Sequence, residues 1–221
     1  MTAQGLRYPR MRHVAVPRPP KGPERNSLGG HAFLAADIAW PLDEEGKRMV
    51  LFFQFDVRPE FGLALAPNTH IAAFMSPTMN EIHSFEALAS GKDVPERFWD
   101  NQMQHFRIFV FGPDAPLVAS PEPDPYLEHQ ALDFVAREEL GDPFLAIGGE
   151  PKWYQDAETH PGFDFIGQLS ENFPFRKRAS APEQPNTFSD NDYCLFLGNS
   201  IYLFARPEPR DPREIWIVLQ N

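Results

Sequence analysis

The chain has 221 residues, with 20 Phe, 24 Pro, one Cys and a formal net charge of −11. So many prolines disfavour long helices, a lone cysteine (Cys194) cannot form an internal disulfide, and the acidic balance disfavours nucleic-acid phosphates as ligands. The apolar share of 42% argues against disorder. We find no charged leader and no apolar run of about 18 residues, so we expect a cytoplasmic protein that does not span a membrane.

The first 25 residues are basic and rich in proline. They carry six Arg or Lys residues against Glu24 alone, which leaves the rest of the chain with a net charge of −16. Prolines such as Pro17 and Pro19 discourage regular hydrogen bonding, and we expect residues 1–25 to form an extended arm. Because Tyr8 is its one aromatic residue, we expect no nucleic-acid partner for the arm, and no membrane partner.

Residues 26–221 are expected to form one domain. It divides into a first half at about 26–112, an acidic, proline-rich linker at about 113–125, and a second half at about 126–221. Apolar runs predict strands at 50–57, 69–75, 106–111, 163–169, 193–197, 201–205 and 215–219. Helical spacing of apolar residues predicts a short helix at 80–89 and a second at about 124–140.

The two halves repeat one pattern. Gly29-Gly30, Trp40 and Gln54 recur about 120 residues later as Gly148-Gly149, Trp153 and Gln168. Each copy has a glycine turn, an aromatic and proline loop, and an apolar strand with one glutamine. The predicted fold is therefore α+β and mostly β: two pseudo-symmetric halves from an internal duplication, packed around one aromatic core, with two or three short helices.

The segment from Asn26 to Leu34, followed by Trp40-Pro41 and Leu51–Asp56, resembles the opening signature of the YwqG-like family, a bacterial group of domains of unknown function. Gly148–Trp153, leading to Gln168, resembles the later element of that family. The resemblance covers residues 26–220 and implies a pseudo-twofold, β-rich fold without an established enzymatic activity. Some relatives are suspected immunity proteins. Ala32 replaces a usual proline, and Ser170 replaces an acid after the second glutamine.

The histidines do not have metal-ligand spacing, and we expect no metal site, no cofactor and no catalytic constellation. His31 and His160 lie in the repeated loops beside acidic residues, so they are candidates for a shared polar site. The glycine pairs lack the context of a phosphate-binding loop. We interpret them as turns with positive φ.

Gln54 and Gln168 are polar residues in strands predicted to be buried. One interpretation is that each amide bonds to loop backbone and holds its glycine turn on the sheet. The other is that both amides, with Asp56, line a cleft between the halves whose aromatic walls are Trp40, Trp153 and Tyr154.

Two main hypotheses of function follow, beside a third in which the basic arm attaches the protein to nucleic acid or to a membrane surface. The first is a non-enzymatic cytoplasmic module that binds a basic protein partner, in its narrower form an immunity protein that neutralises a bacterial toxin. The alternative is a small-molecule-binding protein or an uncharacterised enzyme that uses the cleft between the halves. The sequence leaves the choice open and leans toward the first.

Overall fold

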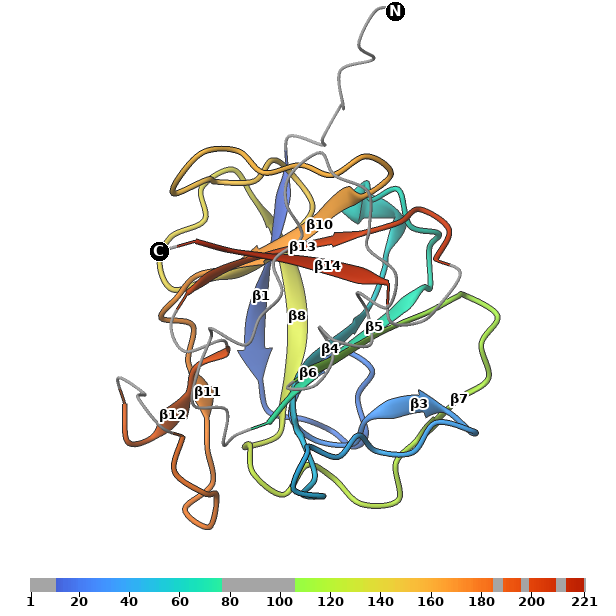
Figure 1. The fold of residues 1–221 in the computed structure, drawn as a ribbon, viewed down its shortest axis with the longest axis vertical. Helices are drawn as coiled ribbons and strands as arrows, with labels where there is room; N and C mark the ends of the chain where they lie inside the picture. The colour runs from blue at the N-terminus through green and yellow to red at the C-terminus, as the bar shows by residue number, and fades with distance from the viewer. Residues whose placement is uncertain (1–10, 77–105, 185–188, 196–198, 210–213, 221) are drawn as a thin grey trace, which may run out of the picture.

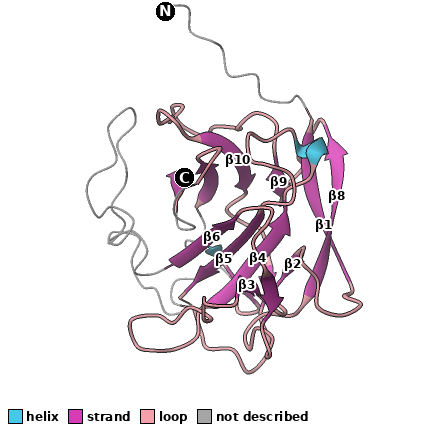
Figure 2. Ribbon diagram, turned by 90° about the vertical axis from the view of Figure 1, so that its right-hand side faces the viewer, coloured by secondary structure: helices cyan, strands magenta, loops and turns pink. Residues whose placement is uncertain are grey.

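The computed structural model describes residues 11–76, 106–184, 189–195, 199–209 and 214–220. The strands are β1 (Arg12–Arg18), β2 (Ser27–Leu28), β3 (Phe33–Ala35), β4 (Val50–Asp56), β5 (His70–Met75), β6 (Phe106–Phe111), β7 (Leu117–Ala119), β8 (Gln130–Arg137), β9 (Leu145–Ile147), β10 (Asp164–Leu169), β11 (Phe175–Arg176), β12 (Asp192–Tyr193), β13 (Ser200–Ala205) and β14 (Ile215–Gln220). Within these ranges the helical structure is a single 3-10 turn, η1 (Pro59–Phe61) (Figure 2).

Ten strands form one continuous sheet in the order β14-β13-β10-β9-β1-β8-β2-β4-β5-β6. The two end strands, β14 and β6, also contact each other, so the sheet nearly closes on itself. In Figure 1, β1 and β8 run side by side through the middle of the molecule, β10, β13 and β14 cross their upper part, and β4, β5 and β6 lie below and to the right. Two short ribbons, β3–β7 and β11–β12, complete the fold.

The strand order is the same on each side of the central β1–β8 pair. β9, β10, β13 and β14 follow β1, and β2, β4, β5 and β6 follow β8. β1 pairs with β9 of the second half, and β8 pairs with β2 of the first half. The N-terminal strand β1 therefore adds to the strands of the second half, and β8, the first strand of the second half, adds to the strands of the first half. Strand β1 lies within residues 1–25, the segment expected to be an arm.

The predicted α+β class is wrong, because the described structure is nearly all β. The segment predicted as a helix at 124–140 contains strand β8, whose residues pair with β1 over seven positions. The spacing of Leu127, Ala131 and Phe134 fits a helix, but pairing on both edges of β8 satisfies its backbone groups and overrides that local pattern. The helix predicted at 80–89 lies outside the described residues.

Most of the strand predictions are confirmed. The runs at 50–57, 69–75 and 106–111 correspond to β4, β5 and β6, and the later runs correspond to β10, β13 and β14. The run at 193–197 is different, since only Tyr193 within it belongs to a described strand, β12. Continuous apolar runs were good predictors because these strands are buried on both faces.

The core has an inner part and two outer layers. Aromatic side chains such as Phe52, Phe55 and Phe61 fill the main cluster. A second cluster lies between the β4–β6 region and the β3–β7 ribbon and includes Trp40 at its margin. A third cluster, with Trp153 packed against it, covers β10, β13 and β14. Each repeated loop therefore lies on an outer layer of its own half.

The glycine turns adopt positive φ, as predicted, and they join the halves. Gly30 has φ 79° and Gly148 has φ 72°. A Cβ on Gly148 would overlap the carbonyl oxygen of Phe61 in the first half, and a Cβ on Gly30 would overlap the ring of His129 in the second half. Only glycine fits these positions, because both the backbone conformation and the close approach exclude a side chain.

Candidate functional site

Gln54 is fully buried in β4 and holds the loop that follows the first glycine turn. Its Oε1 accepts a hydrogen bond from the Phe33 N–H at 3.0 Å. The two N–H groups of its Nε2 are shared among three acceptors, Glu24 O at 3.1 Å, Ser27 Oγ at 2.9 Å and His31 O at 2.6 Å. A buried amide with this many partners stabilises the loop geometry. The arrangement matches the interpretation in which the amide bonds to loop backbone.

Asp56 ends the same strand, and its carboxylate bonds to an arginine and to a histidine. Arg25 donates to both carboxylate oxygens, at 2.8 Å for the shortest contact, and His70 Nδ1 lies 2.8 Å from Oδ1. Burial raises the pKa of Asp56, but the hydrogen bonds from His70 and Arg25 outweigh it and the pKa lies below 3.8. Burial lowers the pKa of His70 below 6.5 against the opposing effect of Asp56. The group is an ionised acid held by a cation and an imidazole.

Gln168 makes a simpler contact in the second half. Its Oε1 accepts from the Lys152 N–H at 2.9 Å, and its Nε2 donates to Lys152 O at 3.0 Å. The amide therefore pairs with one loop residue as a neighbouring strand would. Ser170, which stands where the first half has Asp56, accepts the Phe144 N–H at 2.9 Å.

The other predicted residues of the second half lie around the same loop. Trp153 stacks on Tyr202 with ring centroids 4.5 Å apart. Tyr154 is half exposed, and its N–H lies 3.1 Å from both Tyr202 Oη and Gln220 Oε1. His160 is buried edge-on against Phe163 and Trp216, next to aromatic carbon.

The structure does not bring the two glutamines to one place. Four strands separate β4 from β10 in the sheet, and each amide bonds to the loop of its own half. His31 bonds through Nδ1 to Ser120 O at 2.7 Å, whereas His160 lies in the aromatic layer of the second half. Neither of the two described surface pockets is lined by Gln54 or Gln168.

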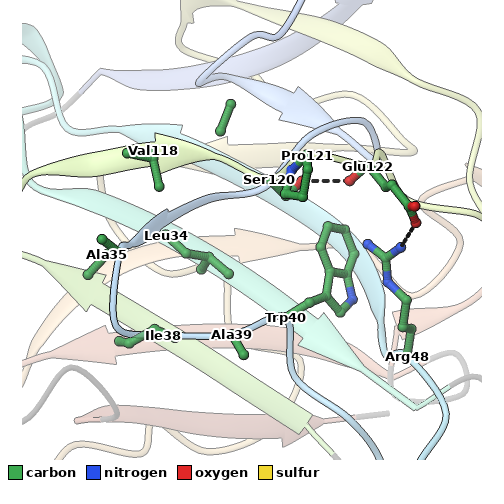
Figure 3. Close-up of a pocket in the computed structure, with 12 residues that line it drawn as sticks. Leu34, Ala35, Ile38, Ala39, Trp40, Arg48, Val118, Ser120, Pro121 and Glu122 are labelled. Atoms are coloured by element: carbon green, nitrogen blue, oxygen red, sulfur yellow. Dashed lines mark hydrogen bonds and ion pairs between the residues drawn. The ribbon is translucent and has the colours of Figure 1, made fainter.

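One concave site among the described residues lies beside Trp40, between the β3–β7 ribbon and the loop at 36–41 (Figure 3). We call it the Trp40 pocket. Its volume is about 320 Å³. It is lined by Leu34, Ala35, Ala36, Ile38, Ala39, Trp40, Arg48, Val118, Ala119, Ser120, Pro121 and Glu122. Most of these side chains are apolar, and Val118 is 54% exposed at the rim.

One end of the Trp40 pocket is polar. The Arg48 guanidinium lies over the Trp40 ring, 4.0 Å from its centroid, and its Nη1 is 3.3 Å from Glu122 Oε2. The Trp40 indole Nε1–H donates to Met49 O at 2.8 Å and so holds the ring in place. Arg48 Nε is buried and has no hydrogen-bond partner among the described residues. The pocket therefore has a fixed aromatic wall and a cation whose contact with the rim carboxylate is long.

Glu122 is the acidic residue that lines the Trp40 pocket, and the neighbouring sequence is rich in further acids. The two segments that form it carry Asp37, Asp43, Glu44, Glu45, Asp114 and Glu122 against the basic residues Lys47 and Arg48. Most of these acids are exposed, and the Glu122 side chain is 80% exposed. An apolar hollow with this charge balance attracts a ligand that combines apolar surface with positive charge.

Of the site predicted from sequence, only Trp40 lines this pocket. Sequence reasoning missed Arg48 and Val118. The signal that could have found Val118 is its place beside prolines in an acidic linker, where an apolar side chain has few neighbours to bury it. Asp124 in the linker was missed as well. It is fully buried, and its carboxylate accepts the N–H groups of Leu51, Tyr126 and Leu127. Burial raises its pKa above 3.8 against those hydrogen bonds.

In comparisons with known proteins, no family model and no curated protein matches the chain. The resemblance to the YwqG-like family stays a prediction. Among the described residues, no three His, Cys, Asp or Glu side chains are grouped closely enough to hold a metal ion. Nor does that part of the chain contain a helix with the length and apolar character needed to cross a membrane.

Proposed function

We propose that this protein is a non-enzymatic, cytoplasmic module that binds a basic protein partner through the Trp40 pocket. The observation that carries the proposal is an apolar hollow, walled by Trp40 and Val118, with the exposed carboxylate of Glu122 in its lining and further acids in the adjoining sequence. Protein interfaces concentrate binding energy in such aromatic pockets and use surrounding charge for rapid capture. In its narrower form, the module is an immunity protein and the basic partner is a toxin.

The polar residues that the sequence suggested as a ligand or reaction site also favour this proposal. Gln54 and Gln168 use their amides to hold loops, and Asp56 is bonded to Arg25 and His70. These groups are engaged in the fold, whereas Trp40 and Val118 present surface to a ligand. The support is therefore stronger for recognition than for a reaction.

A capture experiment with matched variants tests the proposal. Val118→Asp places a charge in the pocket rim, and Val135→Asp places the same charge on β8, where the valine is 43% exposed. We expect the wild type and Val135→Asp to retain one purified basic partner at low salt, and Val118→Asp to lose it. Co-expression with a neighbouring toxin gene then measures rescue of growth. Equal capture by both variants would contradict the proposal.

A small-molecule ligand is the second candidate, because about 320 Å³ lies at the lower end of the range of ligand sites. A thermal-shift screen of metabolites distinguishes the two. A compound that raises the melting temperature of the wild type and not that of Val118→Asp would favour this candidate. The cleft between the halves that the sequence suggested, lined by both Gln54 and Gln168, has no support in the geometry.

A further inference from the structure

The charge around the Trp40 pocket restricts the chemistry of its ligand. Arg48 is the cation that could attract an anion, but its guanidinium already lies on the Trp40 ring and reaches Glu122. The other charged residues of the lining segments are mostly acidic. An anionic ligand would therefore meet repulsion from the rim before it reached Arg48. A cationic ligand meets more acidic than basic residues on its approach, and in the pocket the Arg48 charge is partly offset by Glu122.

Glu122 is positioned to bind such a cation. Its Oε2 contacts Arg48 at 3.3 Å, while the side chain is 80% exposed. Its backbone oxygen accepts the Ser120 Oγ–H at 2.7 Å, which holds the turn that carries it. A lysine or arginine from a ligand can approach the exposed carboxylate without displacing Arg48. A carboxylate with two side-chain partners is already present elsewhere in this protein, at Asp56, which bonds to Arg25 and to His70.

The apolar part of the Trp40 pocket has room for a side chain. Its walls come from Leu34, Ile38 and Trp40, and Val118 forms the exposed rim (Figure 3). Burial of one leucine-sized side chain strengthens binding by about tenfold or more, which is enough for this contact to dominate the affinity of a short peptide.

We propose that the Trp40 pocket receives an apolar side chain from a partner segment in which lysine or arginine flanks that residue, and that Glu122 selects the flanking cation. This inference rests on the proposed function and names the recognition element. Trp40 and Val118 hold the apolar side chain, and the acidic rim sets the preference for basic neighbours.

Peptide titration followed by NMR tests the inference directly. The probe is a short capped peptide with one leucine between lysines, compared with an alanine-centred peptide and with a glutamate-flanked leucine peptide. The reporter is the Trp40 indole N–H signal, assigned by its loss in Trp40→Phe. We expect only the lysine-flanked leucine peptide to shift this signal, with an affinity that falls as salt is added.

Variants separate the two parts of the site. Val118→Asp should weaken the leucine peptide about tenfold or more through lost apolar contact, while Val135→Asp should leave binding unchanged. Glu122→Gln should weaken it about threefold and reduce the salt dependence. Equal binding of the alanine or glutamate peptides, or shifts confined to residues outside the pocket, would overturn the inference.

The outcome is distinguishable from failure of the proposed function. If a captured protein partner depends on Val118 but no basic peptide shifts the Trp40 signal, the recognition element is wrong and the binding function stands. If neither partner capture nor peptide binding depends on Val118, both proposals fail.

Discussion

The loops that carry Trp40 and Trp153 follow equivalent glycine turns but leave different surfaces. Trp153 stacks on Tyr202, whose hydroxyl also donates to Lys152 O at 2.7 Å, so this loop lies closed on the sheet. Trp40 meets Phe74 edge-on at 5.2 Å and stands beside an open pocket. The same sequence pattern therefore produces a covered surface in one half and a hollow in the other.

The difference originates in the strands beneath the loops. Gln168 faces Tyr202 across the β10–β13 pair, and Gln54 faces Ala72 at the matching position of the β4–β5 pair. The phenol ring supports Trp153, whereas a methyl group gives Trp40 no comparable surface. A second difference lies two residues further along each strand. Asp56 faces His70 in the first half, whereas the corresponding positions of the second half are Ser170 and Ser200.

The largest expected effect is at the closed loop. Tyr202→Ala removes the stacking surface of Trp153 and two hydrogen bonds to the loop, and we expect it to lower the free energy of unfolding by about 4 kcal/mol. Tyr202→Phe keeps the ring and should cost only about 1 kcal/mol. Urea denaturation measures both. Similar losses for the two variants would show that the ring itself does not support the loop.

The two glutamines should differ in a similar way. Gln54→Leu leaves loop groups of Glu24, His31 and Phe33 without partners, so we expect a loss of about 3 kcal/mol. Gln168→Leu leaves only the backbone N–H and C=O of Lys152 without these partners, and it should lower the free energy of unfolding by about 2 kcal/mol. Chemical denaturation of the pair gives the ranking. The reverse order would mean that the second loop depends on its amide more than its contacts indicate.

A pH series separates the halves by their titratable groups. The pKa of His70 is lowered by burial and that of Asp56 is lowered by its partners, so the unfolded state binds more protons at both sites. Stability from His70 is present above pH 6.5 and is lost as the pH falls below it; that from Asp56 is lost below pH 3.8. We therefore expect the free energy of unfolding, measured by urea denaturation, to fall less between pH 7 and pH 5 in His70→Gln than in the wild type.

Ser170→Ala serves as the control for this series. It removes a hydroxyl that does not titrate, and it should lower stability by about 1 kcal/mol to the same extent at both pH values. Asp124 acts in the opposite sense to Asp56, because its pKa is raised by burial and acid relieves that cost. An unchanged pH slope in His70→Gln would assign the acid sensitivity to other groups.

The smallest expected effect on stability is at the pocket rim. Glu122→Gln removes an exposed ion pair and should change the free energy of unfolding by less than about 0.5 kcal/mol, although it weakens peptide binding. Thermal unfolding checks the first part. A large destabilisation would indicate that the carboxylate organises the linker and would confuse any binding measurement made with this variant.

The buried strands and the glycine turns could be predicted from local sequence alone. Strands such as β4, β5 and β13 are continuous apolar runs because both of their faces are covered, and a Gly-Gly pair before an aromatic loop has few alternatives to a turn with positive φ. These features depend on local composition. A single chain segment therefore contains enough information to predict them.

The remaining features depend on contacts between segments that are distant in the sequence. Whether residues 130–137 became helix or strand depended on the free edges of β1 and β2, which lie far away in the sequence. Whether a tryptophan loop closed or left a pocket depended on Tyr202 or Ala72 on a neighbouring strand. Pairing and packing partners are set by the register of distant strands, and apolar periodicity within one segment carries no record of that register.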